Sequence, residues 1–161
     1  MSERLIVPLS PALLPRAAAV VEHALHDTHY LEGAMDALRS AVLAPGAEER
    51  ALASMTSDEI EGVVVFGTFA GTSGAGRLHF VVVDTRARRR GVARALVNAA
   101  IESLTASGAR FVLVELPDDA RELTGSRNCL AALGFVEESR VGDFYRDGIA
   151  LAFMRRELSP E

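Results

Sequence analysis

Residues 77–116 constrain the fold of this chain more than any other stretch. The letters RLHFVVVD (77–84) are typical of a strand, and the apolar residues from Val92 to Leu104 then recur at helical spacing. A second strand-like run, RFVLVEL (110–116), follows. A strand, a helix and a strand in succession predict two parallel strands joined by a crossover helix. We therefore expect an α/β chain.

The remaining segments extend this unit in the order β-α-α-β-β-β-α-β-α-β-β, which predicts an α+β mixed sheet. The predicted strands lie at 4–9, 50–56, 59–71, 77–84, 110–116, 135–141 and 148–158. The predicted helices lie at 11–27, 32–43 and 91–106 and within 119–133, and 142–147 is expected to be a loop. The start of the helix within 119–133 is ambiguous, because Gly125 interrupts the pattern. No repeat or linker interrupts the chain, so one domain at 1–161 is expected.

Composition narrows the class of protein. The 161 residues carry a formal net charge of −5, which argues against a general nucleic-acid binder. No apolar run approaches the roughly 20 residues of a membrane span, and the N-terminal letters lack a signal-peptide pattern. Cys129 is the only cysteine, which excludes an internal disulfide. A cytoplasmic protein is expected.

Arginines gather at the junction between the strand and the helix. Five of the 17 basic residues lie there: Arg86, Arg88, Arg89, Arg90 and Arg94. The first turn of a helix leaves N–H groups unpaired and carries partial positive charge, which favours a phosphate. Gly91 lets the backbone approach a ligand, and Ala93 keeps the next turn small. These features predict a pyrophosphate-type anion at residues 88–93.

Two other interpretations of the cluster stay open. It could be a solvated charge run, although a helix N-terminus disfavours cations. It could also bind nucleic acid, although such a surface spreads its basic residues and interleaves aromatic ones. No aromatic residue lies between Phe80 and Phe111. We therefore expect no nucleic-acid partner.

The residues around this junction resemble motif A of the GCN5-related N-acetyltransferase (GNAT) family. Arg88–Ala93 matches the family's pattern Gln/Arg-x-x-Gly-x-Gly/Ala at the start of the central helix. The segment LAALGF (130–135) resembles the family's second marker, a helix that closes on Leu-Gly-Phe. The specific match covers about 77–135, and the N-terminal half matches in layout only.

The resemblance implies a GNAT-like acyl-CoA N-acyltransferase fold and acetyl-CoA as cosubstrate, with no metal. Its pyrophosphate would lie on the arginine-rich turn and its pantetheine arm along the preceding strand. The implied cofactor-binding residues are Val81, Val82, Val83, Arg88, Arg89, Arg90, Gly91, Val92, Ala93, Arg94 and Asn128. The second substrate would be an amine of a small molecule or peptide. Homodimers are common in the family.

His79 is the candidate general base, because a histidine titrates near neutrality and lies twelve residues before Gly91. The period of a strand predicts His79 on one face of the sheet with Val81 and Val83, and Leu78 opposite with Phe80 and Val82.

The family's usual acid, a tyrosine four residues before the glycine of Leu-Gly-Phe, is Leu130 here. Tyr145, Cys129 or solvent could replace it, and Tyr145 is the residue we predict. The departure also leaves open a non-catalytic acyl-CoA sensor.

The acceptor site is expected near the two N-terminal helices, because the family places this region over the acceptor pocket. Tyr30, Glu32 and Asp36 are the candidate substrate-binding residues. The nearby histidines His23, His26 and His29 have spacing that a metal could use, but polar residues are expected at a helix end and we predict no metal site.

Overall fold

The computed structural model describes residues 3–44 and 49–158, and its elements follow the predicted order. The strands are β1 (Arg4–Pro8), β2 (Arg50–Thr56), β3 (Glu59–Thr68), β4 (Ala75–Val83), β5 (Phe111–Pro117), β6 (Val136–Arg146) and β7 (Ile149–Glu157). The helices are α1 (Leu14–Leu25), α2 (Leu31–Leu43), α3 (Val92–Ala106) and α4 (Ser126–Ala132), with a short 3-10 turn at Thr85–Ala87. No described helix is both long and apolar enough to cross a membrane.

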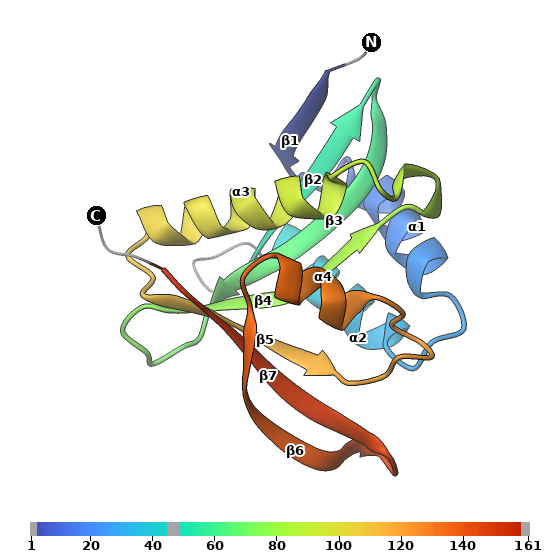
Figure 1. The fold of residues 1–161 in the computed structure, drawn as a ribbon. Coiled ribbons are helices and arrows are strands. Elements are labelled where there is room, and N and C mark those ends of the chain that lie inside the picture. Colours follow the sequence, from blue (N-terminus) through green and yellow to red (C-terminus); the bar gives the residue numbers. More distant parts are fainter. Residues whose placement is uncertain (1–2, 45–48, 159–161) are drawn as a thin grey trace.

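The strands form one mixed sheet in the order β1-β2-β3-β4-β5-β7-β6 (Figure 1). β1 to β4 are an antiparallel meander, β4 and β5 are parallel, and β7 lies between β5 and β6. The crossover predicted from 77–116 is thus confirmed, with α3 as its helix.

Helices cover both faces of the sheet, α1 and α2 on one side and α3 and α4 on the other (Figure 1). The central strand β3 is therefore apolar on both faces. Val63 and Val65 face the core beneath α1 and α2, whereas Val64 and Phe66 face the core beneath α3 and α4.

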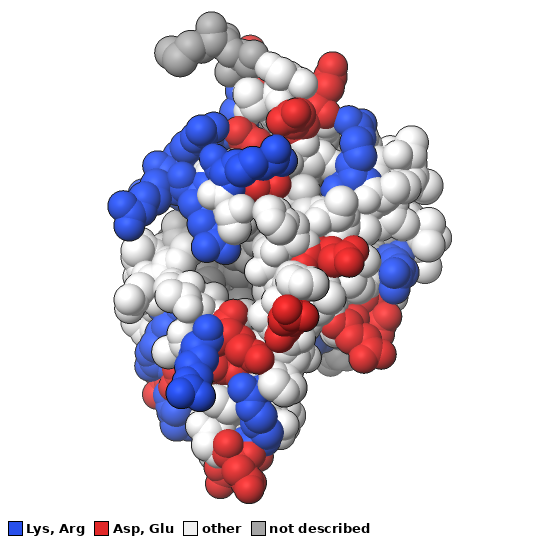
Figure 2. Space-filling model, turned by 90° about the vertical axis from the view of Figure 1, so that its right-hand side faces the viewer, with Lys and Arg blue, Asp and Glu red and all other residues white. Residues whose placement is uncertain are grey.

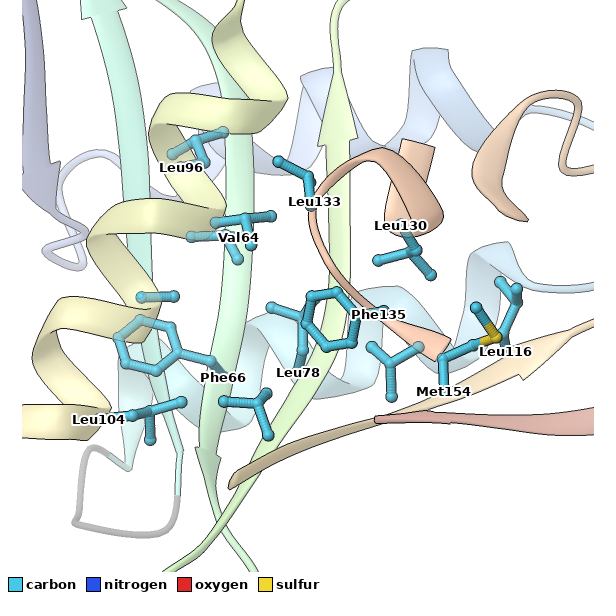
Figure 3. Close-up of a cluster of buried hydrophobic side chains, with 14 of the residues drawn as sticks. Val64, Phe66, Leu78, Leu96, Leu104, Leu116, Leu130, Leu133, Phe135 and Met154 are labelled. Carbon is cyan, nitrogen blue, oxygen red and sulfur yellow. The ribbon is translucent and has the colours of Figure 1, made fainter. Parts of the chain in front are cut away.

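The core beneath α3 and α4 joins the crossover to the C-terminal half of the chain. Leu96 and Leu104 of α3 pack in the same cluster as Leu130 of α4, Leu133 at its C-cap and the fully buried Phe135 (Figure 3). Each large apolar side chain buried in this way contributes about 1.5–3 kcal/mol. This packing fixes α4 beside the C-terminal ends of β4 and β5.

A bulge in β4 changes which side chains share a face. Phe80 pairs with Val65 and Leu78 pairs with the next residue of β3, so His79 is the extra residue. Leu78 packs beneath α3 and α4, whereas Phe80 and Val82 pack beneath α1 and α2. The predicted grouping of Leu78 with Phe80 and Val82 is wrong, because strict alternation ends at the bulge.

The helix expected within 119–133 is α4, which begins at Ser126 directly after the interrupting Gly125, whose backbone is left-handed (φ +81°) at the N-cap. Some strand ends differ from the predictions, and β3 ends at Thr68 rather than at residue 71. Strand β6 continues to Arg146, so residues 142–145 belong to the hairpin and not to a loop.

Candidate active site

β4 and β5 separate near the middle of the sheet. Their ladder joins Ala75–Leu78 to Phe111–Val114, and beyond it β4 pairs only with β3 and β5 only with β7 (Figure 1). We call the gap between residues 79–83 of β4 and 115–117 of β5 the wedge. On this side residues 79–83 have no strand partner in the described part of the chain, and their backbone groups are available to a ligand.

The register shows which backbone groups face the wedge. The N–H of Asp84 donates to the carbonyl of Glu61 on β3 at 2.7 Å. Because backbone groups alternate along an antiparallel strand, those of Val82 also point to β3, and those of Val81 and Val83 point into the wedge. Of the three predicted valines, the register brings Val81 and Val83 to the wedge and leaves Val82 in the β3 ladder.

The turn between β4 and α3 exposes the first N–H groups of the helix. Gly91 at the N-cap has φ +75° and Arg89 has φ +64°, so the chain reverses through two left-handed residues. The first helical bond runs from the N–H of Ala95 to the carbonyl of Gly91 at 3.0 Å. The N–H groups of residues 92–94 therefore have no partner within the helix.

Four arginines lie just before these N–H groups in the chain or on the first turn of α3, and we call them the arginine turn: Arg88, Arg89, Arg90 and Arg94. All four are exposed, and no described carboxylate lies within 4.0 Å of their guanidinium groups. Figure 2 shows basic side chains gathered beside a hollow in the face toward which β4 and β5 open. Four uncompensated cations at a helix N-terminus are unfavourable without an anion.

Arg86, the fifth arginine of the cluster, has a different environment. Its Nε lies 3.2 Å from Oδ1 of Asp84, which also accepts the backbone N–H of Arg86 at 2.9 Å. These bonds, chiefly the one from the guanidinium, lower the pKa of the buried Asp84 carboxyl. Arg86 is thus committed to a structural carboxylate, which the sequence alone does not distinguish from ligand binding.

Helix α4 supplies little polar chemistry. Leu130, in the position of the family's usual tyrosine, is buried in the core. Burial raises the pKa of the neighbouring Cys129 thiol, and Arg94 partly offsets that rise, so Arg94 lies near α4. The predicted pantetheine contact Asn128 is exposed on the same helix.

His79 lies at the bulge, where the wedge begins. Its side chain is 13% exposed, and Nε2 is 3.3 Å from Oε1 of Glu49. Burial, followed by the charge of Arg77, lowers the pKa of His79 to about 4. A nearby carboxylate such as Glu49 favours the charged imidazolium, but burial disfavours it more strongly, because the charge is costly away from water. His79 is therefore neutral at pH 7 and a weak base.

An ion pair that the sequence analysis missed lies beside His79. Arg77 Nη2 is 3.2 Å from Oε1 of Glu115, the first residue of β5 beyond the parallel ladder. Burial raises the pKa of Tyr145, and Glu115 adds to that rise while Arg77 opposes it, so Tyr145 lies near this pair. The sequence did contain a signal for this pair: Arg77 and Glu115 are the only residues of formal charge in β4 and β5, which are otherwise largely apolar.

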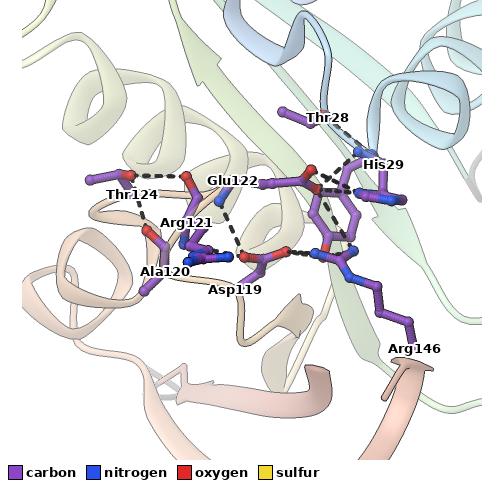
Figure 4. A network of polar contacts seen from close by, with 9 residues as sticks. Thr28, His29, Asp119, Ala120, Arg121, Glu122, Thr124 and Arg146 are labelled. Carbon is purple, nitrogen blue, oxygen red and sulfur yellow. Dashed lines mark hydrogen bonds and ion pairs between the residues drawn. The ribbon is translucent and has the colours of Figure 1, made fainter. Parts of the chain in front are cut away.

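Tyr30 is held in a polar network rather than directed freely at a substrate. Its hydroxyl donates to Oδ2 of Asp119 at 2.7 Å, and Arg146 Nη2 donates to the same atom at 2.7 Å (Figure 4). Burial and Asp119 raise the pKa of Tyr30 to about 12. Its ring contacts Tyr145 edge to face, with centroids 5.9 Å apart.

The other two predicted acceptor residues lie elsewhere. Glu32 and Asp36 are exposed on α2, opposite the buried residues Ala34 and Leu38 that face the sheet. Asp36 lies 3.9 Å from Arg39 of the same helix. The structure therefore does not bring Glu32 or Asp36 together with the residues of the wedge.

Two of the three N-terminal histidines have a close carboxylate neighbour. His29 Nδ1 lies 2.7 Å from Oε2 of Glu122, and His26 Nε2 lies 3.3 Å from Asp27. Within residues 3–44 and 49–158, no three His, Cys, Asp or Glu side chains cluster closely enough to hold a metal.

Two surface depressions lie outside the wedge. One, of about 390 Å³, is bordered by His23, Asp58 and Asp84. The other, of about 330 Å³, is bordered by Arg50 and Ser107. Neither includes a residue of the wedge or the arginine turn, because the wedge is an open gap between strands.

Comparison with known proteins agrees with this geometry. Residues 19–135 match the model of the acetyltransferase (GNAT) family. No curated protein matches the chain in sequence.

Several solved structures share the fold. A protein assigned to the GNAT family from Desulfovibrio desulfuricans has a TM-score of 0.88 at 20% identity, with 98% of this chain and 100% of that chain covered. A ribosomal-protein alanine N-acetyltransferase from Escherichia coli has a TM-score of 0.78 at 16% identity, with 99% and 96% covered. An aminoglycoside 6′-N-acetyltransferase complexed with coenzyme A also has a TM-score of 0.78 at 16% identity, with 98% of both chains covered. By its sequence match, its strand order and its open wedge, this chain belongs to the GNAT acetyltransferase family.

Proposed function

We propose that this protein transfers the acetyl group of acetyl-CoA to an amine of a small molecule or peptide by direct attack on the thioester. One observation carries the proposal: the unpaired edge of β4 runs directly into the arginine turn and the free N–H groups of α3. An extended ligand with a pyrophosphate at one end is complementary to both parts.

The cofactor would use the two parts as follows. The pyrophosphate binds the N–H groups of residues 92–94 and the four guanidinium groups of the arginine turn. The pantetheine amides pair with backbone groups of Val81 and Val83, as a strand would, and Asn128 contributes from α4. The acetyl group then lies toward His79, where β4 and β5 begin to separate.

The proposed reaction balances without a metal. The ammonium first loses one proton to neutral His79, or through it to water, and Glu49 beside Nε2 stabilises the charge that develops. The neutral amine then attacks the thioester carbon, the C–N bond forms, and collapse of the tetrahedral intermediate breaks the C–S bond. Tyr145, whose raised pKa keeps it protonated, donates to the departing thiolate, and the second proton released by the nitrogen restores the Tyr145 hydroxyl through solvent.

Two observations favour a second candidate, a non-catalytic acyl-CoA sensor. Leu130 replaces the polar group expected on α4, and His79 is a weak base. The sensor and the enzyme share the cofactor site and differ only in turnover.

Release of free thiol from acetyl-CoA in the presence of an amine panel distinguishes the two. The panel includes aminoglycosides, peptides with a free N-terminal amine, and simple alkyl and aryl amines. The enzyme proposal predicts thiol release with at least one amine and a lower turnover in His79→Gln at unchanged acetyl-CoA affinity. Binding of acetyl-CoA without release for any amine would favour the sensor.

A further inference from the structure

We infer that Tyr30, Asp119 and Arg146 are positioning residues, which together hold the rings of Tyr145 and Phe144 as the acceptor-facing wall of the active site. This inference rests on the proposed function and assigns a role to side chains that do not touch the reacting atoms.

Asp119 is the centre of the network. It is 3% exposed, and its two carboxylate oxygens accept bonds from four donors. Oδ2 accepts from the hydroxyl of Tyr30 and from Nη2 of Arg146, and Oδ1 accepts from the backbone N–H groups of Arg121 and Glu122 at 3.2 Å. These bonds lower the pKa of Asp119 against the opposing effect of burial. A buried, ionised and fully bonded carboxylate is a rigid anchor, because losing any donor leaves charge uncompensated.

The anchor joins three segments that are distant in sequence. Tyr30 lies between α1 and α2, Asp119 between β5 and α4, and Arg146 at the end of β6 (Figure 4). A second carboxylate strengthens the junction. Glu122 accepts a hydrogen bond from the backbone N–H of His29, contacts Nδ1 of the same residue, and lies 3.8 Å from Nη1 of Arg146.

The sheet itself holds Tyr145 poorly. Val141 pairs with Leu151 and Arg146 pairs with Ile149, so residues 142–145 of β6 lie opposite a single residue of β7. Within this bulge the ladder does not fix the direction of the side chains. Arg146, which ends the bulge, is fixed by Asp119 instead.

Ring contacts extend this order to the bulge. Tyr30 contacts Tyr145 edge to face, and Tyr145 contacts Phe144 with centroids 5.0 Å apart. Phe144 is 55% exposed and Tyr145 is 37% exposed. Tyr145, which lies near Glu115 at the wedge, and the adjoining ring of Phe144 form a wall against which the body of an acceptor can pack.

The neighbouring residue provides a matched control. Asp118 bonds Nη2 of Arg140 at 2.6 Å, also on β6, but its side chain is 30% exposed and contacts neither tyrosine. Asp118→Asn therefore removes a similar carboxylate one residue away without disturbing the rings.

The first test is spectroscopic and needs no acceptor. The chain has two tyrosines and no tryptophan, so Tyr30→Phe leaves Tyr145 as the only tyrosine fluorophore. This background removes the Tyr30 hydroxyl but keeps its ring and the three other donors to Asp119. Adding Asp119→Asn to this variant should increase quenching of Tyr145 by acrylamide, whereas adding Asp118→Asn should not. Equal quenching in the two double variants would overturn the positioning role.

The second test is kinetic and uses the amine that the wild type acetylates fastest in the panel. Asp119→Asn should raise the KM for that amine by about tenfold or more, because displaced Tyr145 and Phe144 rings would no longer align the amine with the thioester. The Kd for acetyl-CoA should be unchanged. Asp118→Asn should match the wild type, and an equal KM in both variants would overturn the inference. If Asp119→Asn does not fold, Arg146→Gln replaces it, because it removes the ion pair with Asp119 and keeps both tyrosines.

Failure of the proposed function gives a different result. The wild type itself would then release thiol with no amine, which would also remove the acceptor role, even where Tyr145 still responds to Asp119→Asn.

Discussion

Leu78 of β4 and Val114 of β5 form the last pair of the parallel ladder. The next residue of β4 is His79 at the bulge, and the next residue of β5 is Glu115, paired with Arg77. The separation of two strands thus creates both the free backbone edge and the place where charged side chains meet. Ligand sites at the carboxyl ends of parallel strands arise for the same topological reason.

The arginine turn should contribute directly to cofactor affinity. Replacing Arg88 or Arg90 by Gln should weaken acetyl-CoA binding by about threefold to tenfold each, because each removes a charged donor from the pyrophosphate. Arg86→Gln is the control, since Arg86 is paired with Asp84 and should leave the Kd unchanged. Calorimetric titration measures each Kd. Equal effects of Arg86→Gln and Arg88→Gln on the Kd would contradict the conclusion that Arg86 stabilises Asp84 whereas Arg88 binds the cofactor.

Gly91 should be required for its backbone conformation. A Cβ at this position meets no atom within 4 Å, but φ is +75°. Gly91→Ala should therefore lower the free energy of unfolding by about 1 kcal/mol through backbone strain alone. Gly33 of α2 also has open space around it but has no positive φ, so Gly33→Ala should stabilise by up to about 1 kcal/mol. Urea denaturation measures the free energy of unfolding of both variants. A Gly91→Ala variant more stable than the wild type would show that position 91 does not require glycine.

The lowered pKa of His79 should make the protein sensitive to acid. Between pH 6.5 and about 4 the unfolded chain protonates this histidine and the folded chain does not, so stability falls as the pH drops through this window. The loss reaches about 3 kcal/mol at the lower end. His79→Gln should lack this component, which urea denaturation at a series of pH values can measure. Parallel pH profiles for wild type and His79→Gln would show that the histidine is not held neutral.

Tyr145 should act on turnover rather than on cofactor binding. Tyr145→Phe keeps the ring contacts with Tyr30 and Phe144 and removes only the hydroxyl. If the hydroxyl protonates the thiolate, kcat should fall by about tenfold to a hundredfold with the acetyl-CoA Kd unchanged. A kcat equal to that of the wild type would assign the proton to solvent or Cys129.

Periodicity predicted the elements well because each buried face repeats at its own spacing. β2 matches its predicted bounds, and the crossover at 77–116 already implied the parallel pair. The bulge at His79 was not predictable, because one extra residue leaves no mark on an apolar run. The interruption at Gly125, by contrast, was visible in the sequence, and Gly125 is the N-cap of α4.

The site was predictable where local chemistry defines it and not where tertiary contacts do. Arg88–Gly91 stand out in the sequence because charge and glycine coincide at a helix start. The commitment of Arg86 to Asp84 and the bonding of Tyr30 to Asp119, 89 positions away, depend on packing that the sequence does not show.

Calorimetric titration of acetyl-CoA into the wild type and Gly91→Glu tests the cofactor site most directly. We expect binding in the micromolar range for the wild type and its loss in the variant, because a carboxylate at the N-cap of α3 would occupy the pyrophosphate site and repel the anion. Circular dichroism of both proteins verifies that the variant is folded. Wild-type protein that binds no acetyl-CoA, or a folded variant that binds it equally well, would contradict the central claim.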